Sequence, residues 1–271
     1  MLHVRSSDQL DELDAHDLRL QRRLSVPGDL WRHMQDMAAC ARRRRLFISH
    51  STLNCVYVLV LSEAAGTAGE AWSTWKTDGS PWGLSVTPDS GSLLLTLRYE
   101  DRVDEYSSEG LRLRRVELRA SAGVFSPWHV VQLSSLAGES PLLVVGHGDR
   151  ADDVVRVGLV RVLDGKDGGS VAERWYGGPP GSSGHLLSRP QHLAVAARHG
   201  GTLAVADVFN DRVLLLDDQL RRVGMASTGD NTAREWRTSR VCWVGRRLCV
   251  AEVRVVEGRF NASRLTLYEI R

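Results

Sequence analysis

Short apolar runs, interrupted by glycine, proline and small polar residues, recur along the whole chain. The clearest stretch covers residues 189–223. Three short β-strands are predicted there, at residues 193–195, 203–206 and 213–216, because turn residues separate runs of strand length. A unit of this kind has two apolar faces and cannot bury both alone, so a stable fold needs several copies.

Six copies can be counted from the residues that open the third strand of each unit. In every copy, a small polar residue is followed two positions later by valine or leucine. These apolar anchors lie 46 to 58 residues apart, which is the length of a propeller blade. The anchors are Leu10, Val56, Val103, Val155, Val213 and Leu265.

A first strand opened by proline also recurs, at residues 81–86, 127–132 and 190–195. Proline suits this position because it presets φ and gives up no ladder hydrogen bond there. With Pro190, residues 203–207 and residues 210–213, the unit at 189–223 resembles an NHL repeat, the blade of a six-bladed β-propeller. A second unit, residues 81–118, shares the pattern less fully, and the other four share only strand pattern and anchor.

The resemblance and the spacing together predict an all-β fold, a six-bladed β-propeller of NHL type. We expect the first blade to lack its innermost strand and the last blade to lack its outermost strand. The ring then closes imperfectly, or the chain is a piece of a longer protein. Residues 1–271 are expected to form a single domain, with blade segments at residues 2–26, 30–62, 74–118, 126–176, 189–223 and 238–271.

Composition adds limits on function. Of 271 residues, 25% are charged and 42% hydrophobic, and the net charge of +2 does not indicate a nucleic-acid partner. The longest apolar run, residues 55–61, is too short to span a bilayer, and acids near the N-terminus do not fit a signal peptide. We therefore expect a cytoplasmic protein without a membrane partner.

Four cysteines lack the CxxC spacing of a zinc site. Cys242 and Cys249 would face each other if their hairpin has a two-residue turn, and we expect two thiols rather than a disulfide.

Charged residues recur in a pattern of their own. Acidic pairs at residues 11–12, 104–105 and 217–218 precede arginine pairs, so cross-strand ion pairs are expected on a solvated outer face. Residues 42–45 are four consecutive arginines without nearby acids in the sequence. They form either a solvated turn, the favoured interpretation, or a patch for phosphate or an acidic partner.

His129 and His192 occupy equivalent positions in innermost strands and are predicted to line the central channel. Imidazoles there could bind a metal, and one enzyme of this fold family, the peptide-amidating lyase, holds zinc at the axis with histidines. A third matching histidine is missing, since the equivalent position in another blade is Gly83. We therefore expect no resident metal or cofactor, and Trp82 and Trp128 are expected to wedge adjacent blades together.

No GxSxG motif, phosphate-binding glycine loop or axial acid pair is present, so no catalytic residue is predicted. The favoured function is a non-enzymatic, monomeric scaffold or substrate-recognition domain that binds a protein partner through loops on one face. An axial-metal enzyme and an RNA-binding NHL domain are the alternatives. The predicted binding residues are His50, Arg98, Tyr99, His147, Arg150, Val208 and Phe209, with residues 254–261 beside them.

Overall fold

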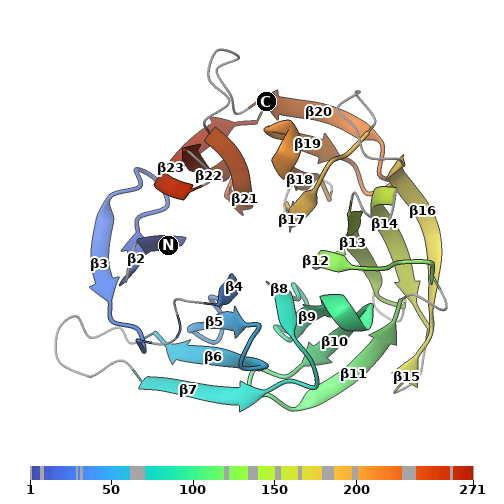
Figure 1. The fold of residues 1–271 in the computed structure, drawn as a ribbon, viewed down its shortest axis with the longest axis horizontal. Coiled ribbons are helices and arrows are strands. Elements are labelled where there is room, and N and C mark those ends of the chain that lie inside the picture. The colour runs from blue at the N-terminus through green and yellow to red at the C-terminus, as the bar shows by residue number, and fades with distance from the viewer. Residues whose placement is uncertain are drawn as a thin grey trace.

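The computed structural model describes residues 2–6, 9–28, 30, 33–61, 71–118, 122–133, 140–149, 154–163, 167–178, 186–196, 201–227, 236–256 and 259–270. Its strands form sheets that radiate from a central axis (Figure 1). The all-β propeller architecture is therefore confirmed. Among the described residues, no helix is long and apolar enough to cross a membrane.

The described strands form six sheets, antiparallel except at β15, and in five of them the first strand in the chain lies at the axis. The first three are β1 (Leu2–Ser6), β2 (Gln9–Leu13) and β3 (Leu20–Leu24); β4 (Met34–Cys40), β5 (Arg45–His50), β6 (Cys55–Val60) and β7 (Ala71–Lys76); and β8 (Pro81–Val86), β9 (Leu93–Leu97), β10 (Arg102–Tyr106) and β11 (Arg112–Glu117). The next three are β12 (Pro127–Leu133), β13 (Leu142–Asp149), β14 (Val154–Val162) and β16 (Ser170–Gly178); β17 (Pro190–Val195), β18 (Leu203–Asp207), β19 (Arg212–Leu216) and β20 (Arg222–Ser227); and β21 (Trp236–Val244), β22 (Arg247–Val256) and β23 (Arg259–Glu269). The two-residue strand β15 (Asp167–Gly168) leaves its own blade and pairs in parallel with β11 of the preceding sheet.

The prediction of six blades needs a correction. Five sheets place an innermost strand beside the axis, and these strands contact one another in the order β4, β8, β12, β17, β21. The β1–β3 sheet contributes no such strand. In that sheet β1 takes the position of the second strand of a blade and pairs with β2, so the position of the innermost strand has no strand of this sheet. Five blades therefore reach the axis, and a three-stranded sheet completes the circumference (Figure 1).

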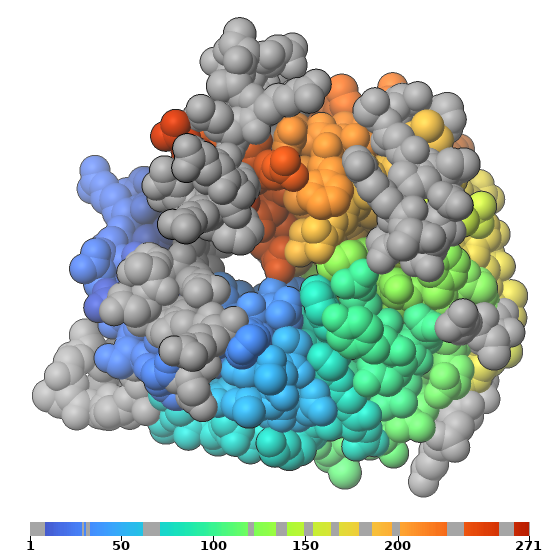
Figure 2. All heavy atoms as spheres, viewed as in Figure 1, coloured from blue at the N-terminus to red at the C-terminus, as the bar shows by residue number. Residues whose placement is uncertain are grey.

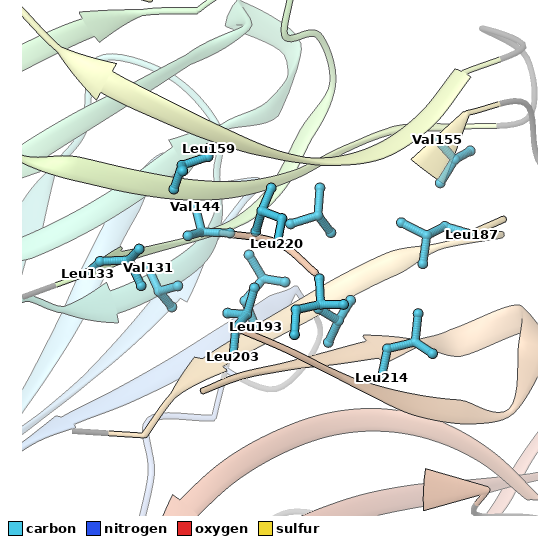
Figure 3. Close-up of a cluster of buried hydrophobic side chains, with 13 residues drawn as sticks. Val131, Leu133, Val144, Val155, Leu159, Leu187, Leu193, Leu203, Leu214 and Leu220 are labelled. Carbon is cyan, nitrogen blue, oxygen red and sulfur yellow. The ribbon is translucent and has the colours of Figure 1, made fainter. Parts of the chain in front are cut away.

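Apolar cores lie between neighbouring sheets. Every residue of β9, β18 and β19 is buried, as expected for strands covered on both faces, whereas the outermost β7 has none buried. Figure 3 shows one such core, where Val144 and Leu159 of one blade meet Leu193 and Leu203 of the next. Apolar clusters of the described residues fill each junction from the β1–β3 sheet round to the β21–β23 sheet.

A different contact joins the last sheet to the first. Arg247 of β22 donates to the carbonyl oxygens of His16 at 2.8 Å and Ala15 at 3.2 Å. None of the apolar clusters formed by the described side chains spans this junction. The contacts that the described residues make across this seam are polar.

The predicted cross-strand ion pairs form, but not all of them on a solvated face. Arg22 pairs with Glu12, and Arg115 lies 3.7 Å from Asp104. Glu12 is only 5% exposed and Asp104 is fully buried. The prediction of solvent-exposed acids is wrong at these positions, because the outer-strand arginine covers the carboxylate of the strand before it.

Three further predictions concern strand β4, the β21–β22 hairpin and residues 254–261. β4 is a strand, although residues 31–39 also suited a short helix. Cys242 and Cys249 face each other in the β21–β22 hairpin, as predicted for a two-residue turn, and both thiols are free. The loop expected at residues 254–261 is wrong, because β22 and β23 continue to Val256 and from Arg259.

Glycine marks the closest approach of neighbouring blades. A Cβ atom on Gly83 of β8 would lie 2.3 Å from the carbonyl oxygen of Trp128 in β12. A Cβ on Gly146 of β13 would lie 2.5 Å from the carbonyl oxygen of Pro190. The colliding atoms belong to backbone, which cannot move without separating the blades.

We expect Gly83→Ala to lower the free energy of unfolding by about 1–3 kcal/mol, because the added methyl overpacks the β8–β12 junction. Urea denaturation followed by circular dichroism measures the change. Gly28→Ala is the control, since nothing lies within 4 Å of a Cβ at Gly28. Equal midpoints for the two variants would contradict the expectation.

Candidate functional site

The innermost strands share an irregularity that directs side chains to the axis. In β4, β12, β17 and β21 the pairing register with the second strand shifts near the strand start. The residues that follow this shift are Asp36, His129, His192 and Arg240. Such bulges re-aim side chains, and these four meet at the axis.

Asp36 is the centre of this axial cluster. Its carboxylate accepts hydrogen bonds from the backbone N–H of Met37 and of Leu84, both at 3.0 Å. Arg240 Nε donates to Oδ1 at 3.2 Å. Burial opposes the charged form, but His192, Arg240 and His129 hold the pKa of Asp36 well below its usual value. Asp36 is therefore a fixed negative charge at the axis.

The two predicted channel-lining histidines lie against this carboxylate. Nε2 of His129 is 3.2 Å from Asp36 Oδ2, and Nε2 of His192 is 3.6 Å from Oδ1. The two ring centroids are 4.0 Å apart with an angle of 36° between the planes. Burial, followed by the charge of His129, lowers the pKa of His192 to about 4, so this ring is neutral near neutral pH.

Sequence reasoning placed His129 and His192 together but missed Asp36 and Arg240. In β4, Asp36 stands two residues after Met34, as His129 does after Pro127 and His192 after Pro190. That spacing was the available signal. The spacing was not recognised in the sequence because β4 and β21 do not begin with proline, which marks the start of the other two strands.

A second arrangement lies where innermost strands begin and second strands end. Pro81 pairs with Leu97 and Pro190 with Asp207, so these strand ends meet on one face of the disc. Short 3-10 turns follow the second strands there, η2 (Arg98–Glu100) and η4 (Val208–Asn210). Together they present aromatic rings and guanidinium groups across several blades.

We call this set the aromatic–arginine strip. It consists of Trp82, Arg98, Tyr99, Trp128, Arg189, Phe209 and Arg237.

At one end of the strip, Arg98 lies over two indoles. Its guanidinium carbon is 3.6 Å from the ring centre of Trp128 and 4.9 Å from that of Trp82. The indoles meet edge to face at 5.4 Å across neighbouring blades, as predicted for wedging residues. Tyr99 packs edge to face on Trp82 and is 70% exposed. Cation–π contacts of this kind attract a guanidinium to the faces of aromatic rings.

At the other end, Phe209 lies between two arginines. Arg189 is 4.2 Å from the ring centre of Trp128 and 5.1 Å from that of Phe209. Arg237 of β21 is 5.4 Å from the Phe209 ring, which is 38% exposed. The strip therefore runs over four blades, and the exposure expected for Tyr99 and Phe209 is confirmed.

The turn that carries Phe209 is held by the buried Asp207. Its Oδ1 accepts from the backbone N–H of Ser188 at 2.8 Å and of Arg189 at 3.0 Å. Its Oδ2 accepts from Asn210 at 2.6 Å and from Arg212 Nε at 3.0 Å. One carboxylate thus fixes both the chain before β17 and η4.

Three of the remaining predicted binding residues, His50, His147 and Val208, are buried. His50 ends β5 and is 2% exposed, and its ring contacts those of His33 and Tyr57. His147 lies within β13, fully buried between Phe125 and Trp175. Their predicted placement on loops is wrong, because strands β5 and β13 extend past the expected ends. Val208 is 7% exposed, and Arg150 lies outside the described residues.

The four-arginine turn at residues 42–45 is also more engaged than expected. Arg43 and Arg45 pair with Glu109 of the next blade at 3.4 and 3.0 Å. Arg42 donates to the carbonyl oxygen of Asp89. One acid that is near in space, though distant in sequence, thus pairs with two of the four arginines.

A hollow connects the axial cluster with the strip. It is small and open to solvent. Its lining combines carboxylate, amide, guanidinium and indole groups: Gln35, Asp36, Trp82, Gly83, Trp128, Gln191 and Arg240. Figure 2 shows that the face in view is hollowed near its centre.

Comparison with known proteins gives the fold. No known family profile matches the sequence, and no curated protein matches it. A chain of the nidogen/laminin complex is similar with a TM-score of 0.63 at 15% identity, over 94% of this chain and 89% of that one. Virginiamycin B lyase from Staphylococcus aureus gives 0.58 at 11% identity, over 98% and 78%. The Cps50 (Swd1) β-propeller domain from Myceliophteria thermophila gives 0.57 at 13%, over 97% and 91%.

The shared property is the fold. At these identities the similarity establishes a β-propeller and nothing finer. The resemblance to NHL repeats stays a prediction, because no family profile matches.

His147 should make stability depend on pH. Burial, then the charge of Arg156, lowers its pKa from 6.5 to about 4. Between these values the unfolded state binds a proton that the folded state does not, so stability falls with falling pH. Between about pH 7 and about pH 4.5 we expect a loss of about 2–3 kcal/mol from this residue.

Urea denaturation of the wild type and His147→Phe at both pH values tests this expectation. The variant should lose less stability on acidification, while the contribution of His192 stays in both proteins. An identical pH dependence would contradict it.

Proposed function

We propose that this propeller binds a protein partner through the aromatic–arginine strip, acting as a non-enzymatic scaffold or recognition domain of NHL type. The observation that carries the proposal is the continuous alternation of rings and guanidinium groups over four blades. Tryptophan, tyrosine and arginine are the residues most enriched at the energetic centres of protein interfaces. The strip supplies all three on rigid strand ends.

The strip is also preorganised. Arg98 is held by Trp82 and Trp128, and the backbone of Arg189 is held by Asp207. Side chains that are already ordered lose less entropy on binding, which favours affinity. Three guanidinium groups in a row favour a partner segment that carries carboxylates beside an apolar side chain.

The fold comparisons are compatible with this use of the surface. Propellers similar to this one include a chain of a complex between nidogen and laminin. They also include a lyase, so the fold by itself does not decide between binding and catalysis. The proposal therefore rests on the strip.

The test uses the full chain as an immobilised bait in three forms. Wild type and Met225→Ala should retain the same partner, whereas Tyr99→Ala/Phe209→Ala should lose it. Met225 is the control because it is 53% exposed on β20, the outermost strand of the blade that carries Phe209. For the recovered partner, we expect the double variant to weaken binding by about 2 kcal/mol or more, about 30-fold.

Two outcomes would count against the proposal. A partner retained equally by all three baits would bind elsewhere. A retained species lost on nuclease treatment would be RNA, for which stacking on exposed rings is also suited. Affinity for an acidic protein segment should fall moderately as salt is raised, because the arginine charges are partly exposed.

A further inference from the structure

We propose that Asp36, His129 and His192 form a binding site for a divalent transition metal at the propeller axis. Each residue offers one ligand atom, and these atoms all lie within 4.8 Å of one another. Asp36 and His129 are buried, and 12% of the His192 side chain is exposed. They come from three different blades, so the closed arrangement of the sheets brings together what the sequence separates.

The ring nitrogens support a ligand at this position. Both nitrogens of His129 and Nδ1 of His192 are buried without a hydrogen-bond partner among the described residues. The Nε2 atom of His129 is close to Asp36 but is not aligned for a hydrogen bond. Buried polar atoms without partners are few in native proteins, and a bound ion is one of their explanations.

The donor set selects a class of metal. Two imidazoles and one carboxylate suit zinc, iron(II) or cobalt(II), whereas magnesium and calcium prefer oxygen ligands. The backbone N–H groups of Met37 and Leu84 hold the carboxylate in place, as outer hydrogen bonds do at metal sites. Three protein ligands leave a coordination position for water or a ligand group.

Arg240 binds the carboxylate of Asp36 and therefore competes with a metal ion for it. Its Nε donates to Asp36 Oδ1 at 3.2 Å, and its Nη2 donates to the carbonyl oxygen of Gln35 at 2.6 Å. The Arg240 side chain is 31% exposed and lines the hollow, so it can reach solvent. A guanidinium beside a divalent cation is repelled, so metal binding requires Arg240 to leave Asp36. Binding of a metal ion therefore replaces the guanidinium of Arg240 as the cation beside Asp36.

The test is a titration of chelator-treated full-length chain with Co²⁺ alone and then with Zn²⁺. We expect visible d–d absorption to saturate at one Co²⁺ per chain and to disappear when Zn²⁺ displaces it. His129→Ala and His192→Ala should each weaken binding by at least about 10- to 100-fold. Ca²⁺ and Mg²⁺ should not displace the Co²⁺.

Arg240→Gln provides a variant that deletes no ligand. It should bind Co²⁺ more tightly than wild type, by about tenfold, because the competing guanidinium is gone. His147→Phe is the control, since it alters another buried histidine away from the axis and should leave binding unchanged. Circular dichroism of each variant confirms that it is folded.

The proposal is overturned if wild type shows no saturable Co²⁺ absorption. It is equally overturned if the folded histidine variants bind as tightly as wild type, because the metal then lies elsewhere. Weaker binding by Arg240→Gln would show that Arg240 supports the ion rather than competing with it, which contradicts the exchange of cations. Tyr99→Ala/Phe209→Ala should keep the metal, so this site is tested separately from the partner surface.

Discussion

Every blade of this protein hides its apolar faces only against its neighbours. Strands β9, β18 and β19 are buried along their whole length, and the apolar cores lie at the junctions between neighbouring sheets rather than within one sheet. This mutual burial fixes the distance between blades, and it is tight enough that Gly83 and Gly146 leave no room for a methyl group. The axis and the face are rigid because the junctions are.

Rigid junctions explain how the polar groups at the axis are held. Asp36, His129 and His192 have little exposure at the axis, and each comes from a different sheet. The register shift at the start of each innermost strand turns these side chains inward. Holding a carboxylate and two imidazoles with little exposure to water costs free energy, which the apolar junctions around them offset.

The sequence predicted the propeller because the period of the apolar anchors survives even in divergent blades. It also placed His129 and His192 in equivalent positions, since proline marks the start of both strands. It did not predict Asp36 or Arg240, whose strands lack that mark. It counted six blades where five reach the axis, although it did expect the first segment to lack an innermost strand, as the β1–β3 sheet does. His50 and His147 were misplaced because strand ends cannot be read to one or two residues from composition. The strip was found in part through Arg98, Tyr99 and Phe209, but its continuity depends on Trp82, Trp128, Arg189 and Arg237, which only the packing of blades brings into line.

The polar junction between Arg247 and the carbonyl oxygens of Ala15 and His16 bears on where the circle of sheets opens most easily. Water can replace those hydrogen bonds at little cost, whereas it cannot replace the apolar contacts elsewhere around the circle. Local opening starts where the free-energy cost is lowest. The described contacts therefore favour this seam, rather than a junction with an apolar cluster, as the place where the circle of sheets opens first.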